Sequence, residues 1–226
     1  ARPVRPHIDS WFSLYPVLAD LFAEDAAAGE QSLTETPYVR DAWLHVSQVM
    51  TAREKEGTPQ GLFLAAKGGS NFEPHNHNDV GSFIVYADGR PALIDLGTEN
   101  YTAKTFSPQR YELWYLKSSY HNLPTIGGVV QEAGEAFRAS EVSCKTTAEA
   151  AELSLDIAGA YPEEAGIVSW RRTCRLVRGN DAFVEIVDDF RLRRETDVEY
   201  SLVTPCPPEL PEPGAILLEY AEGRKL

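Results

Sequence analysis

A stretch of strand-forming residues that turns back on itself constrains the fold of this chain most. Residues 82–86 are rich in β-branched and aromatic side chains, which favour β-strands. The dipeptide Asp88-Gly89 follows and favours a two-residue hairpin turn, because both residues tolerate the positive φ angles that such a turn needs. This turn sets the register of the returning strand and predicts that Asp95 lies opposite Ser82.

Two histidines stand just before this hairpin, at His75 and His77. If the strand ran straight from His77, Asp95 would lie five residues away from it, which is about 16 Å at the rise of a strand. A shared metal ion therefore requires a bend between Asn78 and Gly81. Glycine is the residue best able to supply such a bend, so we expect it at Gly81.

A third histidine, His121, lies in another short polar stretch. Imidazole and carboxylate groups together make a good zinc site, so His77, Asp95 and His121 form the candidate ligand set, with one position left for water. His75 would then face solvent or substrate. The alternative remains that the histidines bond ordinary backbone groups and that Asp95 caps the turn at Gly97.

The remaining pattern predicts a mainly β protein. Residues 8–28 have apolar side chains at helical spacing and read as one or two helices, whereas short strands separated by turns dominate after residue 60. Strands of this kind predict an antiparallel β-sandwich. We divide the chain into residues 1–36, a helical segment with a linker, and residues 37–226, the sandwich. We interpret the first residues as the interior of a longer protein, so the sequence does not fix its compartment.

Several strands can be assigned individually. Residues 46–52 alternate between the two faces of one strand, although a helix remains an alternative there. The segment 100–119 is rich in aromatic residues without a clear period and predicts a long excursion over a sheet edge. The other expected strands lie within the segments GLFLAAK, TIGGVVQ, ELSLDIAGAY, WRRTCRLVRG, DAFVEIVDDFRL, VEYSLVTP and ILLEY.

The charge of the chain limits its partners. The formal net charge is −13 and the pI is near 4.8, which argues against nucleic acid or an anionic membrane as a partner, because both need clustered cations. A polyanionic sugar would need a local basic patch, and Lys104, Arg110 and Lys117 supply the one nearest to the histidines. The three cysteines lack the CxxC spacing of a sulfur-ligated metal site and allow at most one disulfide.

The histidine and hairpin motifs together carry a family resemblance. The segment from Glu73 to Tyr111, with its HNHND and IDLGTENY runs, and the later SSYHNLPTIGGVVQ segment resemble the heparinase II/III-like family of polysaccharide lyases. The resemblance is close over about residues 46–143. It implies an α/α-toroid followed by an antiparallel β-sandwich, with the active site in the cleft between them.

The resemblance also implies roles for individual residues. It implies one zinc ion held by His77, Asp95 and His121, and a catalytic role for His75 in neutralising the carboxylate of a uronate. Tyr111 matches a tyrosine that lies near the substrate in some relatives. We further expect contacts with the substrate from Asn76, Arg110 and Tyr115; packing against the sheet is an equal alternative for the tyrosines.

The implied reaction is cleavage of an acidic polysaccharide by β-elimination. Removal of the proton α to the uronate carboxylate develops negative charge there, which a cation or hydrogen-bond donor stabilises. In the family the base and acid come chiefly from the toroid. We therefore expect this chain to be the C-terminal metal-binding domain of a lyase, with its own N-terminal toroid as partner and little activity by itself.

Two other functions are compatible with the sequence. In the first, the sandwich is a carbohydrate-binding module in which Trp114, Tyr111 and Tyr115 stack on sugar rings and zinc is structural. In the second, it is a non-haem iron oxygenase whose ion is held by His77, Asp79 and His121.

Overall fold

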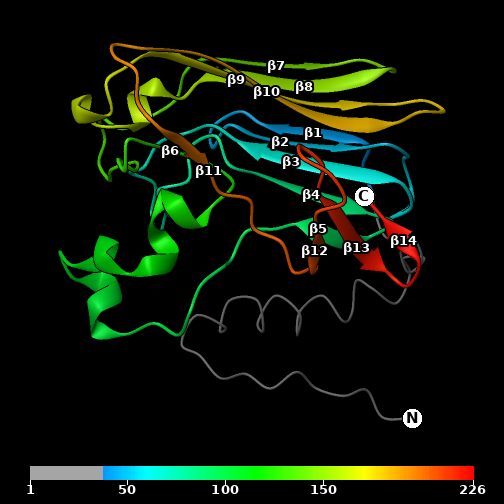
Figure 1. Ribbon diagram of the computed structural model, residues 1–226, viewed down its shortest axis with the longest axis horizontal. Helices are drawn as coiled ribbons and strands as arrows, with labels where there is room; N and C mark the ends of the chain where they lie inside the picture. Colours follow the sequence, from blue (N-terminus) through cyan, green and yellow to red (C-terminus); the bar gives the residue numbers. More distant parts are fainter. Residues whose placement is uncertain (1–37) are drawn as a thin grey trace, which may run out of the picture. The chain divides into compact units, whose positions relative to one another are not determined.

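The computed structural model describes residues 38–226. Two antiparallel sheets stack on one another (Figure 1). The five-stranded sheet has the order β1-β2-β3-β4-β5 and the four-stranded sheet the order β10-β9-β8-β7. The strands of the first are Asp41–Leu44, Val49–Arg53, Leu62–Lys67, Phe83–Ala87 and Arg90–Leu93; β7 to β10 are Ser140–Thr146, Ala150–Asp156, Ile167–Val177 and Phe183–Leu192.

The first hairpin corrects the prediction of one strand over residues 46–52. The chain instead turns between β1 and β2, where Val46 is 84% exposed and Gln48 has a φ angle of 54°. Only Met50 and Ala52 continue the alternation, and both are fully buried on β2. The predicted strand was too long because Val46 and Gln48, which lie in the turn, have the same two-residue spacing as Met50 and Ala52.

The core lies between the two sheets and follows from the period of two in their strands. Every second residue of β8 is buried, beginning with Ala151, and the buried residues of β9 are Trp170, Arg172, Cys174 and Leu176. One charged side chain therefore stands in an otherwise apolar inward row. These strands match the predicted sandwich, whereas β7 was not predicted, because its residues are mostly exposed and lack a buried apolar row.

The central hairpin has the predicted turn but not the predicted register. Asp88 and Gly89 both have positive φ angles, and Ala87 pairs with Arg90. A bulge then shifts the pairing, so that Val85 faces Leu93 instead of residue 92. The alignment of Asp95 with Ser82 was therefore wrong by one residue, because a bulge inserts an extra residue beside Pro91, and proline within a strand occurs mainly at edges or bulges.

The predicted bend before the hairpin is confirmed. Gly81 has a φ angle of 87°, and the amide of Ser82 donates a hydrogen bond to the carbonyl of Asp79 to close a turn. A side chain at Gly81 would meet Ile157 at 2.7 Å. The bend therefore requires glycine both for its backbone angle and for its close approach to the second sheet.

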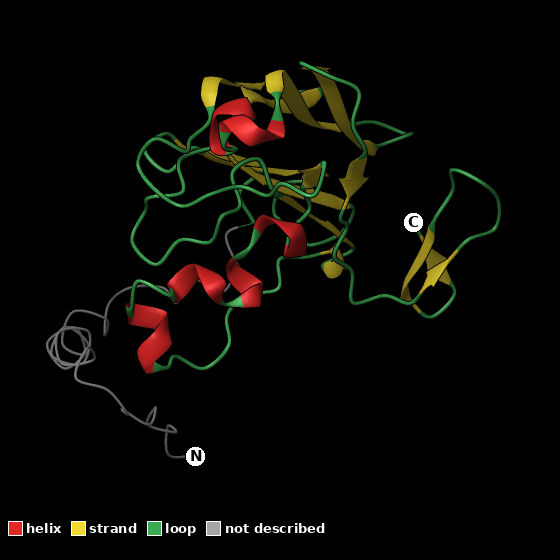
Figure 2. Cartoon of the chain, turned by 60° about the vertical axis from the view of Figure 1, so that its left-hand side comes forward, coloured by secondary structure: helices red, strands yellow, loops and turns green. Residues whose placement is uncertain are grey.

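The excursion between β5 and residue 121 consists of four short 3-10 turns beyond the sheet edge, drawn in red in Figure 2. Their bounds are Ala103–Phe106 (η3), Arg110–Glu112 (η4), Trp114–Leu116 (η5) and Ser118–Tyr120 (η6). Two more, Ala158–Ala160 (η7) and Glu163–Ala165 (η8), connect β8 to β9. An irregular path without strands was the expectation here, and the turns fit it.

Small strand pairs complete the described part of the chain. Pro124–Ile126 (β6) pairs with Val198–Tyr200 (β11), and Leu217–Ala221 (β13) pairs with Pro208–Glu209 (β12) and Arg224–Lys225 (β14). The expected strand VEYSLVTP thus shrinks to three residues. The short strand expected after the Gly127-Gly128 turn does not form; the strand in this segment, β6, lies before the two glycines.

Some expectations have no counterpart in the described residues. The helices at 8–28 and the helical segment 1–36 lie outside them. All three cysteines are free thiols, so no disulfide forms in this structure. Within residues 38–226, no helix is long and apolar enough to cross a membrane.

Candidate metal and substrate site

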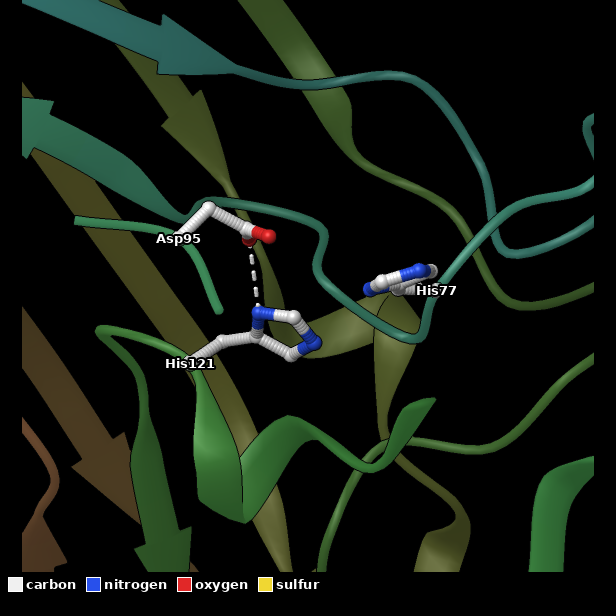
Figure 3. Close-up of side chains that lie close together, drawn as sticks. All are labelled: His77, Asp95 and His121. Carbon is white, nitrogen blue, oxygen red and sulfur yellow. Dashed lines mark hydrogen bonds and ion pairs between the residues drawn. The ribbon is translucent and has the colours of Figure 1, made fainter. Parts of the chain in front are cut away.

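The three residues expected to hold a metal ion lie together. His77, Asp95 and His121 each offer one ligand atom, and these atoms lie within 4.8 Å of one another. Figure 3 shows the group, with His121 beneath Asp95 and facing His77. The Nδ1 atom of His121 and a carboxylate oxygen of Asp95 are 2.9 Å apart, and the two imidazole centroids are 5.3 Å apart.

Three separate segments bring these residues together. His77 lies in the loop before the Gly81 bend, and this loop is tied to the excursion because the amide of Asn78 donates to the carbonyl of Leu116. Asp95 lies two residues beyond β5, and His121 directly follows η6. The ligand set therefore depends on the tertiary fold rather than on the HxH motif.

The site favours the protonation states that bind a metal. Burial and the neighbouring His121 lower the pKa of His77, so its imidazole stays neutral at pH 7. Burial by itself would raise the pKa of Asp95, but its hydrogen bond to His121 and the nearby imidazoles outweigh that effect and lower it. A neutral imidazole and an ionised carboxylate are the forms that coordinate zinc.

One buried atom in the site has no hydrogen-bond partner. His121 is fully buried, and its Nε2 atom meets no donor or acceptor among the described residues. A buried polar atom without a partner is costly, and this one turns toward His77 (Figure 3). Ligands of tetrahedral zinc stand about 3.3 Å apart, so small side-chain movements would bring the group into coordination. The donor set therefore fits zinc.

His75 takes a different position from His77. It is exposed and adopts a φ angle of 61°, a conformation that is uncommon for residues other than glycine. Its ring stacks on Tyr101 with centroids 6.1 Å apart and meets Phe106 edge-on. Tyr101 and Phe106 are 52% and 67% exposed, so His75 belongs to an open aromatic surface beside the ligand group.

Three more of the expected site residues form one cluster. The hydroxyl of Tyr111 donates to Oδ1 of Asn76 at 2.6 Å, and the guanidinium of Arg110 donates to the carbonyl of Asn76 at 3.0 Å. Arg110 has no acidic partner among the described residues. Asn76 is itself buried, so its observed role is to hold Tyr111 and Arg110 beside the two histidines.

Tyr115 and the basic patch differ from the expectation of open substrate contacts. Tyr115 is only 2% exposed and packs edge-on against His77, which agrees with the packing alternative. Lys104 forms an ion pair with Glu112. Arg110 instead donates to backbone carbonyls, one of them that of Asn76, which lies between His75 and His77.

The ligand set of an iron oxygenase does not assemble. Asp79 forms an ion pair with Lys67 at 2.6 Å and does not belong to the group formed by His77 and His121, which takes Asp95 instead. The structure therefore supports the first ligand set over the alternative one.

A hollow of about 730 Å³ lies elsewhere, between the two sheets. Its lining is mainly apolar, and none of the candidate ligands belongs to it. It shares Asn122, Arg172 and Asp188 with the surroundings of the candidate metal group. The candidate ligands therefore lie outside this hollow.

Sequence reasoning missed several residues around the site. Tyr101 and Phe106 were seen only as members of an aromatic stretch, although they surround His75. Asn122 was used only as part of a family motif and Arg172 was not considered, although both are buried. The sequence does offer a signal for Arg172. It stands in the alternating row of β9, and a charged residue among buried apolar ones needs partners.

These features define a β-sandwich with a His₂Asp group at its edge that could hold a metal ion. Residues 50–208 match the family Heparinase II/III-like, C-terminal. The chain therefore belongs to this family. A search of curated proteins finds no match to the chain.

Solved structures share the fold. The heparan sulfate lyase HepC from Pedobacter heparinus is 16% identical, with a TM-score of 0.67, over 94% of this chain and 33% of its own length. A structure of Heparinase III is also 16% identical, with a TM-score of 0.64, over 96% of this chain and 35% of its own. The chain thus spans about a third of the length of these enzymes.

Proposed function

We propose that this chain forms the metal-holding side of the active-site cleft of a polysaccharide lyase that cleaves uronic-acid-containing polysaccharide by β-elimination. The observation that carries the proposal is the His77, Asp95 and His121 group, with its unpartnered Nε2 atom, beside an exposed histidine. Family membership supports the reaction class, because the solved enzymes with this fold are heparan sulfate lyase and heparinase III by name.

In this proposal the residues divide into two tasks. His77, Asp95 and His121 hold one zinc ion, which supplies positive charge and fixes the loops that carry the other residues. His75 and Arg110 face the carboxylate of the uronate, where negative charge develops as the α-proton leaves. Tyr111 lies within the same cluster and is held by Asn76.

A base and an acid are also needed for the elimination. We assign them to a toroid domain that precedes the sandwich in the full-length protein. The 226-residue chain should then bind zinc but show little or no lyase activity alone.

Two measurements on the purified chain test this proposal. Elemental analysis should find one zinc per chain, and incubation with uronic-acid polymers should give no ultraviolet absorbance from unsaturated uronate. Joining the chain to its toroid should restore that absorbance, and a His75→Ala change should then reduce it. Unsaturated product made by the chain alone would contradict the division of tasks, and a chain that takes up no metal would contradict the metal-holding role.

Binding of oligosaccharide without catalysis is a second candidate for the chain alone. The exposed rings of Tyr101 and Phe106 favour it, because aromatic faces with a polar edge pack well on sugars. Trp114 is also partly exposed, whereas Tyr115 is buried, so the expected trio of stacking rings does not form. Calorimetric titration with uronic-acid oligosaccharides would detect such binding.

A further inference from the structure

A buried polar network lies directly behind the metal group. Arg172 on β9 and Asp188 on β10 are directly opposite in the strand register. Two hydrogen bonds of 2.8 and 2.7 Å join the guanidinium to the two carboxylate oxygens. Arg172 is 1% exposed. Burial opposes its charge, but the hydrogen bonds and charge of Asp188 outweigh this and keep the pKa of Arg172 raised, so Arg172 stays charged.

The third guanidinium nitrogen of Arg172 donates to the two loops that carry the histidine ligands. Its Nη1 atom donates to the carbonyl of Gly81 at 3.0 Å and to the carbonyl of Asn122 at 2.9 Å. Gly81 forms the bend four residues after His77, and Asn122 directly follows His121. A single guanidinium therefore joins the backbones of two ligand segments at residues that are 41 positions apart in the chain.

Asn122 extends the network to the third ligand. Its side-chain amide donates to the carbonyls of Phe83 at 2.6 Å and Ile94 at 3.1 Å, and its Oδ1 atom accepts a hydrogen bond from the amide of Val203. Ile94 directly precedes Asp95. The amide lies where the ladder of β4 and β5 ends, so it fixes the point at which Asp95 leaves the sheet.

We propose that Arg172, Asp188 and Asn122 are positioning residues that preorganise His77, Asp95 and His121 for one metal ion. The inference rests on the metal-holding role proposed above. A fully buried ion pair is weak support for stability, since apolar residues often replace such a pair without loss. Here the pair also bonds two carbonyls next to ligands, which an apolar pair could not do. Outer partners of metal ligands of this kind commonly change metal affinity by about 10- to 100-fold.

A control lies on the same face of β9, just beyond its last residue. Arg178 directly follows β9, has a side chain that is 7% exposed, forms an ion pair with Asp41 and also donates to two backbone carbonyls, those of Arg53 and Thr147. It bonds no segment that carries a ligand. Arg172→Met should cost more stability than Arg178→Met, because Asp41 keeps its ion pair with Arg40, and only Arg172→Met should disturb the candidate ligand group.

The test measures Co²⁺ affinity and the absorption spectrum of bound Co²⁺ for both variants of the full chain. We expect Arg172→Met to weaken binding by about 10- to 100-fold and to alter the spectrum, and Arg178→Met to leave both within twofold. Asn122→Leu is a second variant of similar shape that loses both amide donors without adding a charge, so it serves if Arg172→Met does not fold. Equal affinities in the Arg172, Asn122 and Arg178 variants would overturn the inference.

Metal binding and positioning of the histidines can be tested separately. The NMR resonances of the histidine side-chain nitrogens in metal-free protein report the positioning alone. In the variants of Arg172 and Asn122 the signals of His77 and His121 should shift, whereas in Arg178→Met they should not. If wild-type protein binds no Co²⁺, the proposed metal role fails, while shifts confined to the first two variants would still show positioning. If wild-type protein binds Co²⁺ but no such shifts occur, the positioning inference fails alone.

Discussion

The two sides of the candidate site differ in how firmly they are held. On the closed side, His77, Asp95 and His121 converge from three segments, and buried hydrogen bonds fix the backbone next to them. On the open side, His75 lies beside the exposed rings of Tyr101 and Phe106. A metal site needs fixed geometry, whereas a surface for a large substrate needs access. The contrast between the two sides is therefore the one that the proposed function requires.

The largest expected effect comes from breaking the bend on the closed side. Gly81→Ala should lower the free energy of unfolding by about 2 to 5 kcal/mol. The alanine would have to adopt a left-handed φ angle, and its Cβ would clash with Ile157. Gly97→Ala is the control, since it has a similar φ of 69° but nothing within 4 Å; it should cost about 1 kcal/mol. Urea unfolding measures both. Equal losses would show that the approach to Ile157 does not hold the bend.

Removal of a ligand should affect the closed side next most strongly. His77→Ala should weaken zinc binding at least about 100-fold, which corresponds to about 2.8 kcal/mol, and the partly exposed position should keep the fold intact. His45→Ala is the control, because His45 is exposed in the β1–β2 turn. Isothermal titration with zinc measures the affinities, and equal values for the two variants would exclude His77 as a ligand.

How far the sequence predicted the site follows from the kind of contact involved. The bend at Gly81 and the turn at Asp88-Gly89 depend on local backbone geometry, so residue types alone revealed them. The ligand set could be assembled because the hairpin returns Asp95 toward the histidines. The bulge that moved the register by one residue has only Pro91 as a local sign, because proline in a strand can equally mark an edge strand.

Contacts between distant segments were beyond the same reasoning. Arg172 bonds carbonyls at Gly81 and Asn122, 91 and 50 residues away, and no periodicity relates these positions. The burial of Tyr115 likewise depends on its packing against His77. The alternation of buried and exposed residues did predict strands such as β8 and β9. The contacts of Arg172 with the loops at Gly81 and Asn122, however, depend on how the two sheets stack.

A smaller effect is expected from pH in metal-free protein. Because the pKa of His77 in the folded chain lies below its ordinary value of 6.5, the unfolded chain binds a proton first as pH falls below 6.5. The contribution of His77 to stability is therefore present above pH 6.5 and is lost as pH falls toward its lowered pKa. The lowered pKa of Asp95 acts only near and below pH 3.8.

Urea unfolding with a chelator at pH 7.5 and 5.5 tests this sign. Wild-type protein should be less stable at pH 5.5, and the difference should shrink in His77→Gln. A loss of the same size in that variant would mean that other groups carry the pH dependence.

The smallest effect on fold and metal is expected on the open side. His75→Ala should change the free energy of unfolding by less than about 0.5 kcal/mol and zinc affinity by less than about twofold, because the side chain is exposed and outside the ligand group. Binding of uronic-acid oligosaccharides should nevertheless weaken. If zinc affinity fell as much as in His77→Ala, the separation into two sides would be wrong.

Anomalous diffraction from zinc-soaked crystals tests the central claim most directly. The account predicts one zinc peak about 2.0 to 2.2 Å from ligand atoms of His77, Asp95 and His121, with His75 outside the coordination sphere. A peak held by other residues, or crystals in which these three side chains surround no metal, would contradict it.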